Sequence, residues 1–473
     1  MYNCTRNYIN GEWVESGLGG VHDIINPATE QPVGQVAYGT AVDVDRAVAA
    51  ARSAFAEFSR WTADDRVGLL ESIAAEYRRR RDDIAAAITA EMGAPADFSR
   101  RSQAGSGLSH LNATIAALRE VEWEEPAGNS VVWREPIGVC GLITPWNWPI
   151  NQITCKVAPA LAAGCTIVLK PSEIAPIDAS LFAEVLHAAG VPAGVFNLVH
   201  GDGPGVGAAV SAHPDIDMVS FTGSTRAGVL VAKSAADTVK RVAQELGGKS
   251  PNIILESAPL DEAVAAGAHA MFHNTGQSCN APSRMLVPQA VYDEAVKIAA
   301  AVAAETRCGD PHAPDTDIGP VISETQFKRI QGLIAAGLEE GAKLAAGGPG
   351  KPAGLETGYY VKPTVFRDVS NEMTIAREEI FGPVLCMIPY SDLEEAIRIA
   401  NDTDYGLSSY VWGGSREEAL AVARRLRAGM VHVNGANTDI MAPFGGYRKS
   451  GNGREWGRRG IEEFQEIKAV MGA

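Results

Sequence analysis

Two residue types in this chain can do covalent chemistry together, a cysteine and a glutamate. Cys279 closes the stretch Asn274-Thr275-Gly276-Gln277-Ser278-Cys279, and Glu245 opens the stretch Glu245-Leu246-Gly247-Gly248-Lys249-Ser250-Pro251. A thiolate attacks carbonyl carbons, and a carboxylate takes a proton from the thiol or from water. Each residue alone is weak evidence, because a cysteine in a globular chain is more often an inert small apolar residue. The pair predicts a thiol-based acyl-transfer site.

The elements that must position this pair follow from the pattern of apolar residues. Residues 263–272 are predicted to form the helix that leads to Cys279. From Gly138 onward, short apolar strands alternate with helices, and the strands are expected at residues 138–143, 166–170, 196–199 and 218–221. Such alternation predicts a doubly wound parallel sheet.

In such a sheet, ligands bind beyond the carboxyl ends of the strands. Asn147, Lys170 and Gly223 all fall there. A second α/β block is expected from about Pro251 to Arg448.

The remaining segments surround these two blocks. Residues 8–13 read as a strand with a tight turn, and residues 41–90 have a helical spacing of Ala and Leu. Residues 121–136 and 464–471 alternate polar and apolar positions outside both blocks.

Length and composition limit the class of protein. The 473 residues exceed a typical single core, so two or three domains are expected. A net charge of −16 makes nucleic acid a poor partner. Seven cysteines without a CxxC pair fit a reducing compartment. No signal peptide or run of about 18 apolar residues is visible, so we expect a cytoplasmic protein without a membrane partner.

The two stretches around Glu245 and Cys279 together resemble the aldehyde dehydrogenase superfamily, in its NAD-dependent, hydrolytic form. The resemblance covers essentially the whole chain, because further segments agree in the family's order. These segments are Pro145-Trp146-Asn147-Trp148-Pro149, Lys170-Pro171-Ser172-Glu173, Phe221-Thr222-Gly223-Ser224, Glu379-Ile380-Phe381-Gly382-Pro383, and Pro443-Phe444-Gly445-Gly446-Tyr447 running into Ser450-Gly451-Asn452-Gly453-Arg454-Glu455.

The resemblance implies a catalytic role for four residues. Cys279 would form a thiohemiacetal and then a thioester, and Glu245 would activate the water that releases the carboxylic acid. An oxyanion needs preorganised donors, and the family pairs the amide of Asn147 with the backbone N–H of the nucleophile. Lys156 would help to relay protons, although a surface lysine is an alternative.

The resemblance also implies the architecture. We expect an α/β fold of the aldehyde dehydrogenase type, with a doubly wound parallel-sheet NAD-binding domain over residues 1–119 and 137–247. An α/β catalytic domain would cover residues 248–450. A small β oligomerisation element from residues 120–136 and 451–473 would build a homodimer or homotetramer.

The expected cofactor is NAD. A carboxylate such as Glu173 after a strand end accepts hydrogen bonds from a ribose and repels a 2′-phosphate, so NADP is less favoured, although Lys170 could also reach a phosphate. Gly223 and Ser224 open a helix whose N-terminus suits a pyrophosphate. The full set of expected cofactor-binding residues is Ile143, Thr144, Pro145, Trp146, Lys170, Ser172, Glu173, Phe221, Gly223, Ser224, Leu246, Gly247, Glu379 and Phe381.

The positions that line the aldehyde tunnel in this family are unusually polar here. Buried amides require hydrogen-bonding partners, so we expect a substrate with oxygen or nitrogen beyond the aldehyde group. Cys155 stands where succinate-semialdehyde enzymes often carry Arg and betaine-aldehyde enzymes often carry Trp. The expected pocket consists of Trp148, Asn151, Gln152, Cys155, Ser278, Asn280, Asn437 and Phe444, with Asp439 in the same loop as Asn437.

Alternative interpretations remain open at this point. A CoA-acylating semialdehyde dehydrogenase usually lacks a base equivalent to Glu245, and a catalytically silent binding protein would not need an intact Cys279. His269 and His273 are four apart, yet no Glu follows His269 as a zinc-protease motif requires. We therefore expect these histidines to pack or to face solvent, and we expect no metal site.

Overall fold

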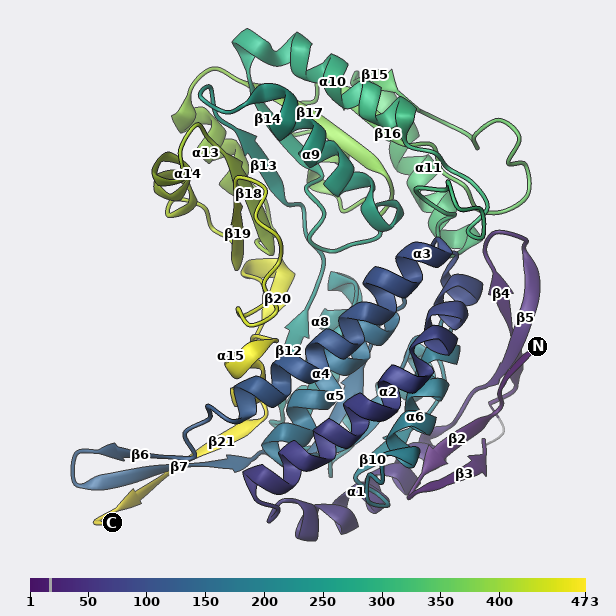
Figure 1. Cartoon of the computed structure of the whole chain (residues 1–473), viewed down its shortest axis with the longest axis vertical. Helices are drawn as coiled ribbons and strands as arrows, with labels where there is room; N and C mark the ends of the chain where they lie inside the picture. The colour runs from purple at the N-terminus through teal and green to yellow at the C-terminus, as the bar shows by residue number, and fades with distance from the viewer. Residues whose placement is uncertain (17–18) are drawn as a thin grey trace.

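A computed structural model describes residues 1–16 and 19–473 of the chain. Two α/β units lie one above the other in Figure 1, and a narrow β-ribbon that carries the C-terminus projects from the lower unit. Each unit is built around its own mainly parallel sheet. The expected α/β fold class with two sheet domains and a small β element is confirmed.

The lower unit contains an eight-stranded sheet. Its five central strands are parallel, and the outer ones are antiparallel. The central strands are buried along most of their length, as is typical of parallel strands that are covered on both faces. In sheet order the strands are β20 (Gly451–Asn452), β12 (Arg241–Glu245), β11 (Met218–Thr222), β8 (Val139–Ile143), β9 (Thr166–Lys170), β10 (Phe196–Leu198), β2 (Arg6–Ile9) and β3 (Glu12–Glu15).

Helices cover both faces of this sheet (Figure 1). The expected helical stretch over residues 41–90 is two helices, because Thr62 starts a second one. The Thr62 hydroxyl accepts from the backbone N–H of Asp65 at 3.1 Å, and the Asp65 carboxylate accepts from the backbone N–H of Thr62 at 3.0 Å. The helices are α1 (Ala41–Phe58), α2 (Ala63–Met92), α3 (Ala96–Phe98), α4 (Ala104–Leu118), α5 (Pro149–Ala163), α6 (Ile177–Ala188), α7 (Ala208–Ala212), α8 (Thr225–Ala236) and α15 (Gly457–Glu462).

The upper unit contains a seven-stranded sheet, in the order β15 (Lys343–Ala346), β16 (Thr364–Arg367), β17 (Val384–Tyr390), β14 (Arg284–Pro288), β13 (Pro251–Ile254), β18 (Ser408–Trp412) and β19 (Met430–Val433). Only β15 is antiparallel to its neighbour. Apolar clusters pack on both faces. The covering helices are α9 (Leu260–Phe272), α10 (Tyr292–Glu305), α11 (Glu324–Glu339), α12 (Thr374–Arg377), α13 (Leu393–Asn401) and α14 (Arg416–Ala423).

Two smaller sheets complete the fold. One is the projecting ribbon of β6 (Glu124–Ala127), β7 (Ser130–Pro136) and β21 (Gln465–Met471), all antiparallel (Figure 1). Of the expected segment 451–473, only β21 joins this ribbon. The part before it contributes β20 and α15 to the lower unit. The other sheet is formed by β1 (Tyr2–Cys4), β5 (Gln31–Ala37) and β4 (Val21–Asn26) near the N-terminus.

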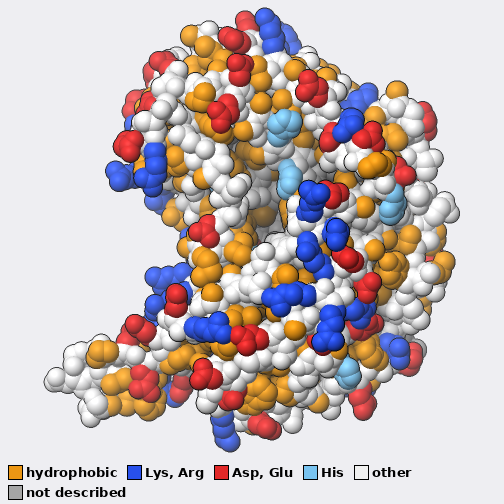
Figure 2. Space-filling view, in the orientation of Figure 1, with side chains coloured by type: hydrophobic (Ala, Val, Ile, Leu, Met, Phe, Trp, Pro, Cys, Tyr) orange, Lys and Arg blue, Asp and Glu red, His pale blue; other side chains and the backbone are white. Residues whose placement is uncertain are grey.

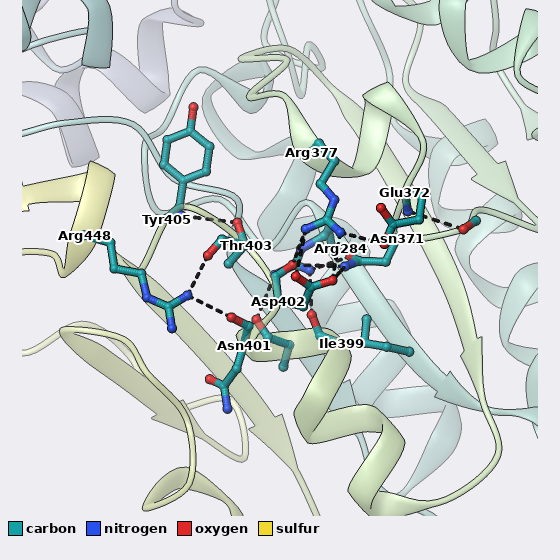
Figure 3. A network of polar contacts seen from close by, with 12 residues as sticks. Arg284, Asn371, Glu372, Arg377, Ile399, Asn401, Asp402, Thr403, Tyr405 and Arg448 are labelled. Atoms are coloured by element: carbon teal, nitrogen blue, oxygen red, sulfur yellow. Dashed lines mark hydrogen bonds and ion pairs between the residues drawn. The ribbon is translucent and has the colours of Figure 1, made fainter.

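A buried arginine fixes the segment that joins the two sheets. Arg284 begins β14 and is fully buried, and its guanidinium donates to the carbonyl of Lys249 at 3.0 Å. It also donates to the carbonyls of Ile399 and Ala400 at the end of α13, and to the side chain of Asn371 (Figure 3). Burial lowers the pKa of Arg284 to about 10, so the group stays charged at neutral pH. Because Lys249 closely follows Glu245, the network anchors the loop beyond Glu245 to the upper sheet.

Candidate active site

The loop that carries Cys279 is held in a strained conformation. It leaves α9 with Asn274 at φ 53° and Thr275 at φ 57°, and for a β-branched residue such a left-handed backbone is a genuine outlier. Gly276, at φ 70°, has no room for a side chain, because a Cβ there would lie 2.2 Å from the carbonyl oxygen of Gly382. Strain of this kind persists where the surroundings enforce it, and it gathers at functional sites.

The side chain of Asn147 is bound to this loop. Its Nδ2 donates to the carbonyl of Gln277 at 3.0 Å. Its own backbone carbonyl accepts from the side-chain amides of Asn274 at 3.0 Å and of Gln103 at 3.1 Å. Gln103 ends a π-helical turn (Ser99–Gln103) before α4, a feature that is often found at functional sites. Sequence reasoning missed Gln103, since nothing near it in the chain points to this position.

Glu245 ends β12, and its carboxylate is buried. Neither of its oxygens has a hydrogen-bond partner among the described residues. Gly445 makes room for it, because a Cβ at Gly445 would lie 2.7 Å from Oε1 of Glu245. Burial and then the charge of Glu455 raise the pKa of Glu245 well above its ordinary value, while Lys156 opposes this effect. A buried carboxyl group without a partner is available for proton transfer.

Cys279, Glu245 and Asn147 line one cavity of about 190 Å³. Burial raises the pKa of the Cys279 thiol, and the charges of Glu379 and Glu245 raise it further. The resting group is therefore a thiol, and its attack on a carbonyl carbon requires a base. Glu245 is the carboxyl group in that cavity with no hydrogen-bond partner among the described residues, whereas Glu379 accepts one from the backbone N–H of Gly248 at 3.0 Å.

Lys156 does not line this cavity. It lies behind it on α5, fully buried, where its ammonium group is ion-paired with Glu455 and donates to Ser220 at 3.0 Å. The thiol of Cys155 lies 3.4 Å from the same Glu455 carboxylate. Glu455 was not among the expected site residues, although it stands in one of the segments that carry the resemblance.

The expected cofactor residues divide between two cavities. Eight of them line the cavity of Cys279, namely Pro145, Trp146, Gly223, Ser224, Leu246, Gly247, Glu379 and Phe381. Ile143, Glu173 and Phe221 line a second cavity of about 580 Å³ beside α8. Thr144, Lys170 and Ser172 line neither. Gln326 and Arg329 on α11 line the first cavity and were not anticipated.

The two cavities suit the two halves of a dinucleotide. The second has apolar walls from Ile143, Phe221 and Val231, and the carboxylate of Glu173 lies in it, ion-paired with Lys170 at 2.9 Å. Ser224 begins α8 and faces the first cavity. Burial raises the pKa of Glu379 to about 7. An apolar cavity, a helix N-terminus and a nearby carboxylate are the features that a nucleoside, a pyrophosphate and a ribose require.

A third cavity of about 480 Å³ lies on the other side of the Cys279 loop. Trp148, Ser278, Asn280 and Asn437 line it as expected substrate-pocket residues. The other four expected residues are not part of its lining. Asn151 is hydrogen-bonded to His110 at 3.1 Å, Gln152 and Cys155 are buried on α5, and Phe444 packs on Trp456 with ring centroids 4.4 Å apart.

Histidines and aromatic residues complete this third cavity. His269 and His273, which the sequence suggested would pack or face solvent, both line it, together with Tyr410 and His432. Figure 2 shows histidine side chains in the hollow between the two units. No group of three or more His, Cys, Asp or Glu in the described part of the chain is placed to hold a metal ion. Across residues 1–16 and 19–473, no helix combines the length and the apolar character that crossing a bilayer requires.

Known proteins resemble this chain over nearly its full length. The model of the Aldehyde dehydrogenase family matches residues 13–470. A 3-succinoylsemialdehyde-pyridine dehydrogenase from a Pseudomonas species is 58% identical over 473 residues, which is 100% of this chain and 99% of that protein.

Solved structures agree with the sequence matches. A mutant of aldehyde dehydrogenase C from Pseudomonas syringae, in complex with NAD+ and octanal, matches with a TM-score of 0.98 at 52% identity, covering 99% of this chain and 97% of that chain. A betaine aldehyde dehydrogenase from Staphylococcus aureus, in complex with NAD+, matches with a TM-score of 0.95 at 37% identity, covering 98% of this chain and 94% of that chain.

Proposed function

The chain belongs to the aldehyde dehydrogenase family and oxidises aldehydes with NAD, and we propose that Cys279, Glu245 and Asn147 carry out this reaction. The observation that carries the proposal is the unpartnered carboxyl group of Glu245 in the same cavity as the Cys279 thiol. Burial raises the pKa values of both groups, and the raised pKa of Glu245 makes it a stronger proton acceptor than an ordinary carboxylate.

The first half of the reaction forms a covalent adduct. Cys279 gives its proton to Glu245 and attacks the aldehyde carbon, which produces a thiohemiacetal. The amide of Asn147 stabilises the developing oxyanion, and the backbone N–H of Cys279 is the second donor. Bound NAD would supply the acceptor for the hydride of this carbon, and Cys279 would then hold the acyl group as a thioester.

The second half releases the product. Glu245 first releases to solvent the proton that it took from Cys279. It then takes a proton from water, and the water oxygen attacks the thioester carbon. The C–S bond breaks to give the carboxylic acid, and Glu245 returns its proton to the sulfur of Cys279. Glu245 supports water rather than CoA as the acyl acceptor, since the CoA-acylating subclass usually lacks this base. The intact constellation likewise argues against a silent binding protein.

We also propose roles for the residues that would bind NAD. Glu173 would accept hydrogen bonds from the adenosine ribose, and its negative charge disfavours the 2′-phosphate of NADP. Glu379 and Phe381 would hold the nicotinamide ribose and ring. Trp146 supports this arrangement, because its ring packs edge-on against that of Phe381 with centroids 5.4 Å apart.

The physiological aldehyde carries polar or functional groups beyond its carbonyl. The amides of Asn280 and Asn437 in the third cavity support this assignment. The names of two similar proteins point to different aldehydes. The Pseudomonas enzyme is named for a pyridine semialdehyde, and the Pseudomonas syringae structure is a complex with octanal.

Domain roles and assembly form a further part of the proposal. Residues 1–119 and 137–247 bind NAD, residues 248–450 carry the nucleophile, and the ribbon pairs subunits into a homodimer or homotetramer. Apolar side chains on the ribbon support the last point, since Ile467 is 65% exposed and Trp133 is 37% exposed. Seven free cysteines support a cytoplasmic location.

A pair of variants tests the chemistry. Cys279→Ala should abolish NADH formation with a panel of aldehydes while NAD binding, followed by fluorescence, persists. Glu245→Gln should slow both the burst of NADH that accompanies acylation of Cys279 and the steady-state rate, because the variant lacks the base for the thiol and for water. Full steady-state turnover by Glu245→Gln would remove the base assignment, and strict dependence on added CoA would replace water as the acceptor.

A further inference from the structure

The 480 Å³ cavity beside the Cys279 loop contains no formal charge. None of its described lining residues is Asp, Glu, Lys or Arg. A charged group that left water to enter this cavity would lose its hydration without gaining a counter-charge, which is costly. The lining therefore disfavours aldehydes with a carboxylate or an ammonium group at the far end.

Several flat rings line this cavity, between small and polar residues. Tyr410 and His432 are stacked, with centroids 4.6 Å apart and an interplanar angle of 10°. Trp148 and His273 form a second pair, 5.8 Å apart and tilted by 31°, and Phe98 packs edge-on against His273 at 4.7 Å. Planar walls favour a planar guest, because offset stacking adds to the burial of apolar area.

Most polar atoms on these rings are already engaged. The indole N–H of Trp148 donates to Ser278 at 2.8 Å, and the hydroxyl of Tyr410 donates to the carbonyl of Asn280 at 2.9 Å. Nδ1 of His432 lies 3.0 Å from the carbonyl of Ala436, and a carbonyl only accepts, so this nitrogen carries the proton. Nε2 of His432 is buried and has no hydrogen-bond partner among the described residues, so it offers an acceptor.

His273 differs from these ring residues because it offers a donor as well. Its side chain is exposed to the cavity, and within residues 1–16 and 19–473 neither ring nitrogen has a hydrogen-bond partner. The protein atoms around His273 partly desolvate its ring, which lowers its pKa and favours the neutral imidazole. A neutral imidazole offers one donor and one acceptor.

We propose that His273 is a specificity-determining residue that donates a hydrogen bond to an acceptor on the far part of the aldehyde. The preferred substrates are uncharged aldehydes whose tail is an aromatic or heteroaromatic ring with an acceptor, such as a ring nitrogen or a ketone oxygen. This inference rests on the proposed function, because it assumes that the aldehyde attacked by Cys279 extends into this cavity.

The same geometry disfavours aldehydes whose tail is a plain alkyl chain. An alkyl tail would cover the imidazole of His273 without replacing the water that solvates it, and an unpaired polar group costs free energy. Sites built for a hydrogen bond reject analogues that lack the partner more strongly than apolar pockets reject an extra methylene. We therefore expect the contact between His273 and the tail to contribute to selectivity, beside the other polar residues of the lining.

Three aldehydes separate the contribution of an aromatic ring in the tail from that of a ring nitrogen. They are octanal, phenylpropanal and pyridylpropanal. The last two differ only in one ring nitrogen. We expect the wild-type protein to give the highest kcat/KM with pyridylpropanal and the lowest with octanal. His273→Phe keeps a ring against Phe98 and Trp148 but removes the donor. It should lower the ratio of kcat/KM for pyridylpropanal over phenylpropanal by about tenfold, mainly through KM.

Two further variants test whether loss of the hydrogen-bond donor at position 273 causes the change in the kcat/KM ratio. His273→Gln retains a side-chain donor and should restore part of the ratio. His22→Phe is the matched control, because His22 stacks on Tyr38 in the small N-terminal sheet, outside the cavity, and its ratio should equal that of the wild type.

The outcomes distinguish this inference from the proposed function. If no aldehyde reduces NAD, the proposed function fails. If octanal is oxidised but the ratio is unchanged in His273→Phe, or if octanal is the best substrate of the wild type, the role of His273 is overturned while the dehydrogenase assignment stands.

Discussion

The ammonium group of Lys156 forms an ion pair with the carboxylate of Glu455 inside the protein, although the two residues lie 299 positions apart in the chain. Burial alone would lower the pKa of Lys156, but the charge and hydrogen bond of Glu455, together with Cys155 and Glu245, outweigh this effect and the net pKa is raised. The pair lies close enough to Glu245 for each partner to act on its pKa, in opposite directions. Burial is the main cause of the raised pKa of Glu245, and Lys156 and Glu455 adjust the pH at which this proposed base would ionise.

Substitution of either partner should move the acidic limb of the kcat/KM profile. Glu245 acts as a base when ionised, so activity appears as the pH rises through its raised pKa. Lys156→Gln removes a cation that holds this pKa down, and the limb should shift to higher pH. Glu455→Gln removes an anion that raises it, and the limb should shift to lower pH. Identical shifts in both variants would contradict the electrostatic explanation, and the circular dichroism spectra should match the wild type.

Gly247 is predicted to be essential for cofactor binding because it leaves room for Glu379. A Cβ at Gly247 would lie 2.2 Å from Oε2 of Glu379. Gly247→Ala should displace this carboxylate and raise the KM for NAD by about tenfold or more, with a smaller effect on the KM for the aldehyde.

Gly332 provides the matched control for this substitution. It lies on α11, and a Cβ there would meet nothing within 4 Å. Gly332→Ala should leave the kinetics unchanged and should raise stability by up to about 1 kcal/mol, because alanine has the higher helix propensity. An unaltered KM for NAD in Gly247→Ala would show that Glu379 does not hold the cofactor.

The choice between NAD and NADP is predicted to depend on Glu173. Its carboxylate lies in the 580 Å³ cavity together with the side chain of Arg226. Glu173→Gln removes the charge that repels a 2′-phosphate and releases Lys170 from its ion pair. The kcat/KM for NADP should rise while that for NAD falls. Glu184→Gln on α6, which breaks an exposed ion pair with Arg80 of α2, should change neither value.

The ribbon is predicted to hold the subunits together. Ile467→Lys places a charge in the exposed apolar strip of β21, and light scattering should report a lower mass than for the wild type. Val42→Lys is the control, because Val42 is 64% exposed, nearly as much as Ile467, but lies on α1 away from the ribbon. An unchanged mass in both variants would place the subunit interface elsewhere.

The sequence predicted the main sheet strands well, because their signal is local. Residues 138–143 and 166–170 are continuous apolar runs between turns, and they form β8 and β9 within one residue of the predicted limits. The helix before Cys279 was likewise predicted to within three residues. The break between α1 and α2 was missed, because the capping pair of Thr62 and Asp65 interrupts an otherwise helical pattern.

By itself, the sequence determined the family and the type of chemistry, and the local motifs around Cys279 and Glu245 pointed to these two residues as the proposed catalytic pair. The tertiary structure decided which side chains face the same cavity. His273 and Tyr410 meet around the third cavity from distant parts of the chain, and Glu455 reaches Lys156 because β20 pairs with β12 just before it. Such contacts depend on how strands and helices pack, and local periodicity carries no information on which residues will face each other across a cavity.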